Sequence, residues 1–492
     1  MEFNEDLPAL PKGWVWTRVG EIADNIENVN PKTNPDREFL HIDIASIDNK
    51  LQKITNPKKY YGKNAPSRAR QLIISGDILF STVRTYLKNI AVVNDIFDGH
   101  IASTGFCVIR ALPQIHHRYI FWFVQTDFFL NPLNQLQRGT SYPAVRDSDI
   151  SSQVIPLPPL PEQHRIVNKI EELFTKLDAG VDALKKIKIQ LKRYRQAVLK
   201  NAFEGNLTQQ WREAHKEELE PASVLLEKIK EQRKKESKGK FIELPPIDTS
   251  ELPELPEGWV WTRLDYITQN ITKGSTPTSY GFNYKKEGIK FIKTENIIED
   301  GSIANIKDFI DEDANNFLKR SILQTNDILF SIAGTIGRVG LVQERDLPAN
   351  TNQALSLIRL FSENIVNKYV FYFFKSPYIQ KQSLKSIVGV GRANITLTDV
   401  SSYNIPLPPI PEQHQIVAEI ESRFSVADQL DKVVEQSLKQ AEKLRQSILK
   451  WAFEGKLVPQ DPTDEPAEKL LERIKEEKES RGLIKHKSGK GK

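Results

Sequence analysis

The chain has 492 residues, with 69 Lys and Arg, 64 Asp and Glu, one Cys and 39% apolar residues. This length suggests about three domains, with ample chain for large cores. The single cysteine, Cys107, excludes an internal disulfide, and no stretch reaches the roughly 18 consecutive apolar residues of a membrane-spanning helix. Residues 1–6 lack the pattern of a signal peptide, so we expect a soluble protein of a reducing compartment. A net charge of +5 is too small to indicate nucleic-acid binding by itself.

The first 155 residues predict a mixed α+β domain. β-branched and aromatic residues gather in short runs between Gly, Asn and Asp, which is the pattern of strands and turns. The predicted strands are 39–47, 78–83, 90–93 and 106–109. The aromatic stretch 119–129 predicts a buried helix.

Residues 162–203 predict one long helix. It follows a Pro-rich extended entry, places Pro161 at its first position and has Gly205 as its expected C-terminal cap. Its apolar residues recur in alternating steps of three and four, which is typical of a coiled-coil seam. The seam positions are Ile166, Ile170, Leu173, Leu177, Leu184, Ile187 and Leu191.

The charge of this helix is uneven. Seven basic residues and no acidic residue lie between its positions 185 and 200: Lys185, Lys186, Lys188, Lys192, Arg193, Arg195 and Lys200. They suit either a solvated face that complements the helix dipole or a strip along DNA phosphates. A linker at 206–250 follows, with an amphipathic helix and a basic run at 233–240.

The second half of the sequence repeats the first. Residues 10–18 (LPKGWVWTR) recur at 255–263 (LPEGWVWTR), 77–81 (DILFS) at 327–331, and 155–164 (IPLPPLPEQH) at 405–414 (IPLPPIPEQH). The segments between these motifs barely align. Ordered matches of this kind indicate a tandem duplication, with a common frame and independently varied insertions.

The second copy predicts the same elements. Strands are expected at 289–293, 328–332, 339–342 and 355–360, and a buried helix at 369–378. Its long helix has Arg423 and Ser437 where the first has Leu173 and Ile187. The seam positions of the second helix are Ile416, Ile420, Leu430, Val434, Leu444 and Ile448.

These elements predict an α+β fold with an internal pseudo-twofold repeat. Each of two similar mixed α/β domains is followed by a long helix, and the two helices pair as an antiparallel coiled coil because neither is stable alone. The predicted boundaries are 1–155 and 251–405 for the domains, 156–205 and 406–455 for the helices, 206–250 for the linker, and 456–492 for a C-terminal helix with a basic tail.

The motifs of catalysis are absent from the sequence. It has no phosphate-binding Gly-rich loop followed by Lys-Ser/Thr, no strand followed by a Gly-x-Gly turn, and no histidines at zinc spacing. Cys107 lies in an apolar run that is typical of a core. A loose match to a nuclease, Pro35-Asp36 with Asp48-Asn49-Lys50, could gather carboxylates around Mg²⁺, but it has no counterpart in the second copy.

The repeated motifs, together with residues 196–208 (QAVLKNAFEGNLT), resemble the specificity subunit of type I restriction–modification enzymes. The match covers essentially the whole chain, twice in the same order. The resemblance implies two target-recognition domains, each reading one half of a bipartite, asymmetric DNA target, and two helices that set the gap between the halves and dock the modification subunits. It also implies a chain without catalytic residues, cofactor or metal of its own, in the cytoplasm of a prokaryote.

The partners implied are double-stranded DNA, two methyltransferase subunits and two ATP-dependent restriction subunits. S-adenosylmethionine would belong to the former, and ATP and Mg²⁺ to the latter.

Base-reading residues are expected in the segments that differ between the copies, because repeated residues cannot read different half-sites. Side chains that hydrogen-bond bases or hold phosphates define the candidates. In the first copy they are Lys58, Lys59, Tyr60, Arg68, Arg70, Arg84, Tyr86, Lys88, Arg138, Ser141, Tyr142 and Arg146. In the second copy they are Lys273, Ser275, Thr276, Tyr280, Lys293, Thr294, Arg338, Asn352, Arg392 and Asn394.

Two alternatives stay open from the sequence. A helical scaffold that binds proteins without reading DNA predicts no salt-dependent DNA binding by the assembled complex. A metal-dependent nuclease predicts cleavage by this chain alone, lost in Asp48→Ala.

Overall fold

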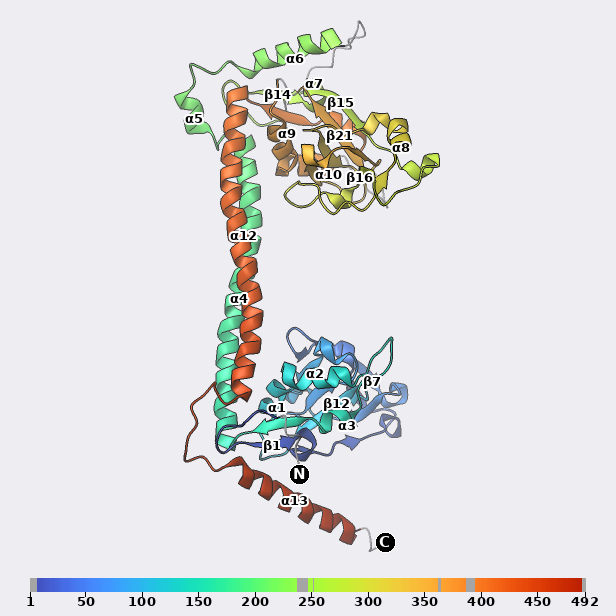
Figure 1. The fold of residues 1–492 in the computed structure, drawn as a ribbon, viewed down its shortest axis with the longest axis vertical. Helices are drawn as coiled ribbons and strands as arrows, with labels where there is room; N and C mark the ends of the chain where they lie inside the picture. Colours follow the sequence, from blue (N-terminus) through green and yellow to red (C-terminus); the bar gives the residue numbers. More distant parts are fainter. Residues whose placement is uncertain (1–6, 237–246, 251, 362–363, 386–393, 489–492) are drawn as a thin grey trace. The chain divides into compact units, whose positions relative to one another are not determined.

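The computed structural model describes residues 7–236, 247–250, 252–361, 364–385 and 394–488 (Figure 1). The chain forms two compact units. Unit 1 comprises Met1–Leu184 and Gln436–Lys492, and unit 2 comprises Lys185–Glu435. In the part of the chain that is described, no helix has both the length and the apolar character needed to cross a membrane.

The α+β domain of unit 1 is built on two main sheets. The first is antiparallel, in the order β10-β9-β12-β2, with β10 Ile90–Val92, β9 Ile78–Ser81, β12 Phe106–Ala111 and β2 Ala23–Asp24. The second has the order β3-β8-β11-β4-β7, with β3 Glu27–Asn28, β8 Ala69–Leu72, β11 Ile101–Ser103, β4 Glu38–Ile42 and β7 Lys58–Tyr61. In it β11 and β4 run parallel. Two antiparallel pairs complete the domain: β1 Val15–Arg18 with β13 Val154–Leu157, and β5 Ile47–Asp48 with β6 Lys53–Ile54.

Three short helices cover unit 1's antiparallel sheet or close its loops: α1 His117–Phe123, α2 Asp127–Gln135 and α3 Asp147–Ser151. The single helix predicted over 119–129 is therefore two helices. The chain breaks because the hydroxyl of Thr126 accepts the N–H of Phe129 and caps α2. The strand predicted over 39–47 likewise ends at Ile42, where Asp43 caps a 3₁₀ turn by accepting the N–H of Ser46.

The α+β domain of unit 2 keeps the first sheet and reduces the second. Its antiparallel sheet has the order β15-β21-β18-β19, with β15 Thr268–Lys273, β21 Leu355–Leu360, β18 Ile328–Ser331 and β19 Val339–Leu341. Its other sheet has three strands, β17 Phe309–Ile310, β16 Ile289–Ile292 and β20 Ala349–Thr351, in which β16 and β20 run parallel. β14 Val260–Arg263 pairs with β22 Asn404–Leu407. The helices are α7 Leu264–Ile267, α8 Glu312–Phe317, α9 Asn367–Phe374, α10 Pro377–Lys385 and α11 Leu397–Ser401.

The two long helices, α4 Leu160–Phe203 and α12 Ile410–Phe453, each have 44 residues. Ion pairs join them in antiparallel register. Arg445 pairs with Asp178 in unit 1, whereas Lys188 pairs with Glu435 and Arg195 with Asp428 in unit 2. From one pair to the next, the residue number falls on α12 by as much as it rises on α4. The structure thus confirms two α+β domains, each with a long helix, and the antiparallel pairing of these helices.

Both long helices end as the sequence predicts. Gly205 has φ +74° and Gly455 has φ +69°, a conformation that favours glycine. The amide of each glycine donates to the carbonyl three residues earlier, and the following amide donates to the carbonyl five residues earlier. These are the two hydrogen bonds of a Schellman cap.

The predicted seam is buried only in part. Leu191 and Val434 are buried, while Ile166, Ile170, Ile416, Ile420 and Ile448 lie in domain cores, Leu173 packs against one, and Leu177 and Leu184 are half-buried. Ile187, Leu430 and Leu444 instead remain 39%, 48% and 44% exposed. The register explains the exposure of Leu444, since it places this residue opposite Ala179 and Gly180, which are too small to cover a leucine.

Each domain core is completed by the other copy. In unit 1, Phe453 of α12 packs edge-on against Tyr119 and Phe123, and in unit 2, Phe203 of α4 packs likewise against Tyr369 and Phe373. The tail helices follow the same exchange. α13 Ala467–Ser488 contributes to the core of unit 1, and α6 Ala222–Glu236 to that of unit 2; the short helix α5 Gln209–Ala214 precedes α6.

The predicted domain boundaries remain predictions, but two of them cut through strands of the structure. The limits after residues 155 and 405 fall inside β13 and β22, which belong to the domain sheets rather than to the helices.

Candidate nucleic-acid interface

The repeated DILFS motif builds the frame of each domain. The Asp77 carboxylate, 1% exposed, accepts two hydrogen bonds from the Arg110 guanidinium at 2.8 and 2.7 Å and the N–H of Ile74. In unit 2, Asp327 accepts the same bonds from Arg359 at 2.8 and 2.6 Å and the N–H of Gln324. The motif therefore repeats a buried ion pair that ties β9 to β12 and β18 to β21.

The other two repeated motifs meet each other. The indole N–H of Trp14 donates to Glu162 at 2.9 Å, and that of Trp259 to Glu412 at 2.7 Å. The neighbouring Gln163 accepts the N–H of His116 and donates to the carbonyl of Pro158, as Gln413 does with Val366 and Pro408. These contacts fix the start of each long helix to its domain, so the repeated residues are structural.

The varied loops of unit 1 bring several predicted site residues together. The guanidinium of Arg84 donates to the carbonyl of Ser141 at 3.0 Å and lies over the Tyr142 ring, 4.9 Å from its centroid. Tyr142 and Tyr86 are 72% and 52% exposed. Arg84 and Lys88 have φ of +50° and +54°, uncommon for side chains with a Cβ. Strained turns of this kind gather at functional sites, and the surface is exposed, aromatic and basic.

The remaining candidates of unit 1 lie around this surface or apart from it. Arg138 pairs with Asp149 at 2.7 Å, and the Arg146 side chain is exposed. Lys88 donates to the carbonyl of Gln125. Lys58, Lys59 and Tyr60 lie on edge strand β7, separated from Arg70 on β8 by β11 and β4, and Arg68 precedes β8. Lys59 pairs with Glu38 and Arg70 donates to Asn30.

In unit 2 one group of candidates lies at the end of β15. The amide of Gly274 donates to the carbonyl of Asn352 at 3.1 Å, which joins the loop of Lys273, Ser275 and Thr276 to the Asn352 turn. The Thr276 hydroxyl donates to Gln353 at 2.5 Å. Tyr280 follows on the same loop and is 52% exposed.

A second group is engaged inside the domain. Lys293 pairs with Asp308 at 2.8 Å and lies over the Tyr284 ring. Arg338 donates to the carbonyls of Thr294 and Ile297. These contacts occupy the cations. Asn394 pairs with Ala333 in an isolated bridge, and Arg392 lies outside the described residues.

Three residues near the first group were not among the candidates. Arg320 donates to the carbonyl of Lys273 at 3.3 Å, Gln353 accepts from Thr276, and Phe317 is 57% exposed. The pair Lys319-Arg320 was a visible signal, since basic residues in the non-repeating segment were the criterion. Phe317 had no such signal, because an aromatic residue is normally assigned to a core.

Cys107 and the acidic residues of the nuclease-like match occupy structural positions. Cys107 is buried, which raises the pKa of its thiol. Asp48 accepts the backbone N–H groups of Leu51 and Lys50, which hold the pKa of its carboxyl below the usual value. Asp36 lies 3.8 Å from Lys63. Across the described ranges, no group of three or more His, Cys, Asp or Glu side chains is arranged to hold a metal.

The basic run of α4 is partly neutralised by its surroundings. Lys188 and Arg195 pair with carboxylates of α12, and Lys200 lies 3.8 Å from Glu204. Some of the basic residues of α4 therefore serve to pair the two helices.

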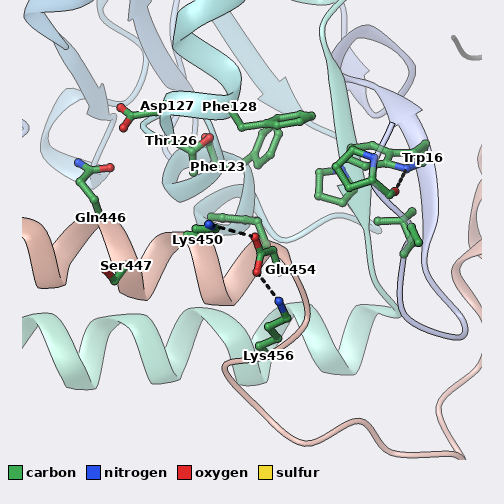
Figure 2. A pocket seen from close by; sticks show the side chains of 15 residues that line it. Trp16, Phe123, Thr126, Asp127, Phe128, Gln446, Ser447, Lys450, Glu454 and Lys456 are labelled. Atoms are coloured by element: carbon green, nitrogen blue, oxygen red, sulfur yellow. Dashed lines mark hydrogen bonds and ion pairs between the residues drawn. The ribbon is translucent and has the colours of Figure 1, made fainter. Parts of the chain in front are cut away.

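An apolar cleft of about 570 Å³ opens beside the first domain (Figure 2). Trp16, Phe123 and Phe128 line it from the domain, Lys450 lines it from α12, and Glu454 lines it from the turn that follows α12. Phe128 is 43% exposed and stacks on Trp16, with ring centroids 5.7 Å apart. At the repeat-equivalent position of unit 2, the hydroxyl of Tyr378 donates to Glu204 at 3.0 Å.

The repeated frame and the different loops define a duplicated two-domain protein. Comparison with known proteins identifies its family. The model of the type I restriction modification DNA specificity domain matches residues 11–193 and again residues 256–440. The chain therefore belongs to the family of type I restriction–modification specificity subunits.

Individual relatives agree with this assignment. The chain is 30% identical over 391 residues to the type I restriction enzyme EcoBI specificity subunit of Escherichia coli, covering 76% of this chain and 75% of that one. It is similar to a chain from a structural study of type I R-M complex assembly and conformational transition, at 30% identity and TM-score 0.66, over 92% of this chain and 100% of that one. It is also similar to the HsdS subunit from Thermoanaerobacter tengcongensis, at 29% identity and TM-score 0.55, over the same shares of the two chains.

Proposed function

We propose that this chain is the non-catalytic DNA-recognition subunit of a type I restriction–modification complex, and that each α+β domain reads one half of a bipartite, asymmetric target. One observation carries the proposal: the copies share a frame of buried contacts, Asp77–Arg110 and Asp327–Arg359, but present different loops. A common frame with different surfaces suits two readers of one polymer with different sequence preferences.

The long helices would set the distance between the half-sites. Their antiparallel ion pairs continue with equal steps along both helices, as a fixed spacer requires. A rise of about 1.5 Å per residue makes seven residues about 10 Å, close to three base pairs of B-DNA.

The spacer is tested by deleting residues 181–187 together with 436–442, which face each other in the observed register. The modification motif is read by sequencing methylated genomic DNA from a host that carries the complete system. We expect both half-sites unchanged and a gap shorter by about three base pairs. A control with Lys185→Ala and Lys439→Ala keeps the helix length and should keep the gap; an unchanged gap in the deletion would contradict the ruler.

The catalytic steps would lie in partner chains. In this proposal, two modification subunits use S-adenosylmethionine to methylate adenine, and two restriction subunits use ATP and Mg²⁺, in the cytoplasm of a prokaryote. This chain would supply the DNA target and the docking surfaces.

The cleft of Figure 2 supports the docking of modification subunits. Its aromatic wall includes the exposed ring of Phe128, and its lining residues Trp16, Phe123 and Lys450 have identical counterparts in Trp261, Phe373 and Lys200. A partner that binds twice would meet the same chemistry in each copy. Phe128→Asp should reduce the co-purifying modification subunits from two to one, whereas Phe128→Tyr, which introduces the residue of the second copy, should preserve both. Equal co-purification of both variants would exclude this cleft.

A further inference from the structure

The second domain carries an exposed aromatic ridge, formed by Tyr280 and Phe317. Tyr280 and Phe317 are 52% and 57% exposed, and their ring centroids lie 5.1 Å apart. Both belong to a segment that does not repeat. Large rings left in water on a folded domain indicate a contact surface.

The ridge packs on a small hydrophobic core of the second domain. Phe282, half-buried, lies 5.4 Å from Phe317 and packs against the small core of Phe291, Ile310, Ala314 and Leu318. The helix α8, which ends at Phe317, is capped by Asp311, whose carboxylate accepts the N–H of Ala314. The capped helix and the core beneath it therefore hold the Phe317 ring in a defined position.

A buried amide network fixes the turn that follows the ridge. Asn350 is fully buried and donates to Asn315 at 2.9 Å and to the carbonyl of Leu318 at 3.3 Å, and it accepts the Ser321 hydroxyl at 2.7 Å. This network ties α8 to β20 and holds Phe317 in place. Such preorganisation lowers the entropic cost of binding.

Cations lie beside the aromatic rings. Lys319 and Arg320 follow Phe317 after one buried residue, Leu318, and are exposed, and Arg320 reaches the carbonyl of Lys273. That contact joins the ridge to the loop of Thr276 and Gln353. An apolar ridge with a cationic flank is complementary to a groove of duplex DNA, whose walls are phosphates.

We propose that Tyr280 and Phe317 contact the 5-methyl group of a thymine in the major groove of the half-site read by the second domain, with Lys319 and Arg320 on the adjacent phosphates. The inference rests on the proposed function and names one element of its base reading. The thymine methyl is the apolar group that base edges present in the major groove, and phenylalanine is a side chain that recognises it.

The test uses the full chain assembled with its modification subunits. Duplexes selected from a random library define the target, and a library that yields no bipartite motif would refute the proposed function rather than the ridge. Each thymine of the second half-site is then replaced by deoxyuridine, which lacks only the methyl group, and binding is measured for the wild type and for Phe317→Ala.

At one thymine we expect deoxyuridine to weaken wild-type binding about five- to tenfold, with a similar loss for Phe317→Ala on intact DNA. Combining the two changes should weaken binding no further than either alone, which is the mark of direct coupling. Ile298→Ala, which truncates another exposed apolar residue of unit 2, should behave like the wild type. The methyl contact would be excluded if, at every thymine, the binding losses caused by deoxyuridine and by Phe317→Ala multiply when the two changes are combined. A sharp DNA kink that depends on Phe317 would also exclude it.

Discussion

The two units surround the same buried carboxylate with different partners. In unit 2, Glu412 accepts hydrogen bonds from Trp259, Thr208 and Arg212, the last at 2.9 Å. In unit 1, Glu162 accepts only the indole N–H of Trp14 among the described contacts, and its Oε1 is buried without a partner. At an offset of 250 residues, the positions equivalent to Thr208 and Arg212 are Val458 and Pro462, whose side chains cannot donate.

The difference shows that the two copies keep the hydrogen bond from tryptophan to glutamate but differ in the charged residues around the glutamate. Arg165 of unit 1 pairs with Asp464 at 2.6 Å rather than with Glu162. Burial raises the pKa of the Glu162 carboxyl, although the hydrogen bond from Trp14 and the charge of Arg165 act in the opposite direction. The two units therefore have similar folds but different electrostatic surroundings for the buried glutamate. Four experiments separate the features that the units share from those that differ.

The largest effect is expected from breaking the shared frame. Asp77→Ala and Asp327→Ala each leave a partly buried guanidinium, Arg110 or Arg359, without its carboxylate, which costs about 3 kcal/mol. Because the contacts of the two pairs are the same, each variant should destabilise its own unit to a similar extent. Hydrogen exchange of peptides from each unit measures this, and a loss in one unit alone would show that the frame is not equivalent.

The loop surfaces should instead act independently of each other. Arg146→Ala is expected to cost about 1–3 kcal/mol of specific binding at the first half-site, and Arg392→Ala a similar amount at the second. Binding to targets altered in one half at a time assigns each loss. An equal loss on unrelated DNA would show that these residues hold phosphates and do not read bases.

Neutralising the two buried glutamates should separate the units. Glu412→Gln removes the charge that Arg212 contacts and should cost unit 2 about 1–2 kcal/mol. Glu162→Gln removes a buried charge that no cation contacts directly, so unit 1 should keep or slightly gain stability at pH 7. Denaturation followed by unit-specific hydrogen exchange compares them, and equal destabilisation would contradict the asymmetry.

The smallest effect concerns pH. Because the folded state raises the pKa of Glu162 above its ordinary value of 4.5, folding favours the protonated form. The cost of the buried charge is fully present above the raised pKa and disappears as the pH falls towards 4.5. The stability advantage of Glu162→Gln over the wild type should therefore be largest at pH 7 and shrink on acidification; a difference independent of pH would exclude this origin.

The sequence predicted the duplicated fold because its strongest signals are local or repeated. Heptad spacing predicted the long helices, and the glycines at 205 and 455 predicted where they end. The break in the aromatic stretch was missed because it depends on one side-chain hydrogen bond, that of Thr126. The exposure of Leu444 was missed because heptad spacing does not specify what lies opposite each seam residue.

The candidate site was harder to predict for a related reason. Lys293 and Arg338 satisfy the composition of a DNA contact, but Asp308 and backbone carbonyls engage them. Conversely, Phe317 has the composition of a core residue and lies on the surface. Whether a side chain faces solvent depends on long-range packing, which periodicity does not report.

The exchange of helix ends between the copies has a consequence for biosynthesis. The core of the first domain includes Ile448, Phe453 and Ile474, hundreds of residues beyond its own strands. The second domain takes Phe203 and Ile229, which precede it in the chain. During translation the second domain can therefore close its core as soon as its own residues emerge, whereas the first domain, although made earlier, must wait with an open apolar face until the last helices leave the ribosome.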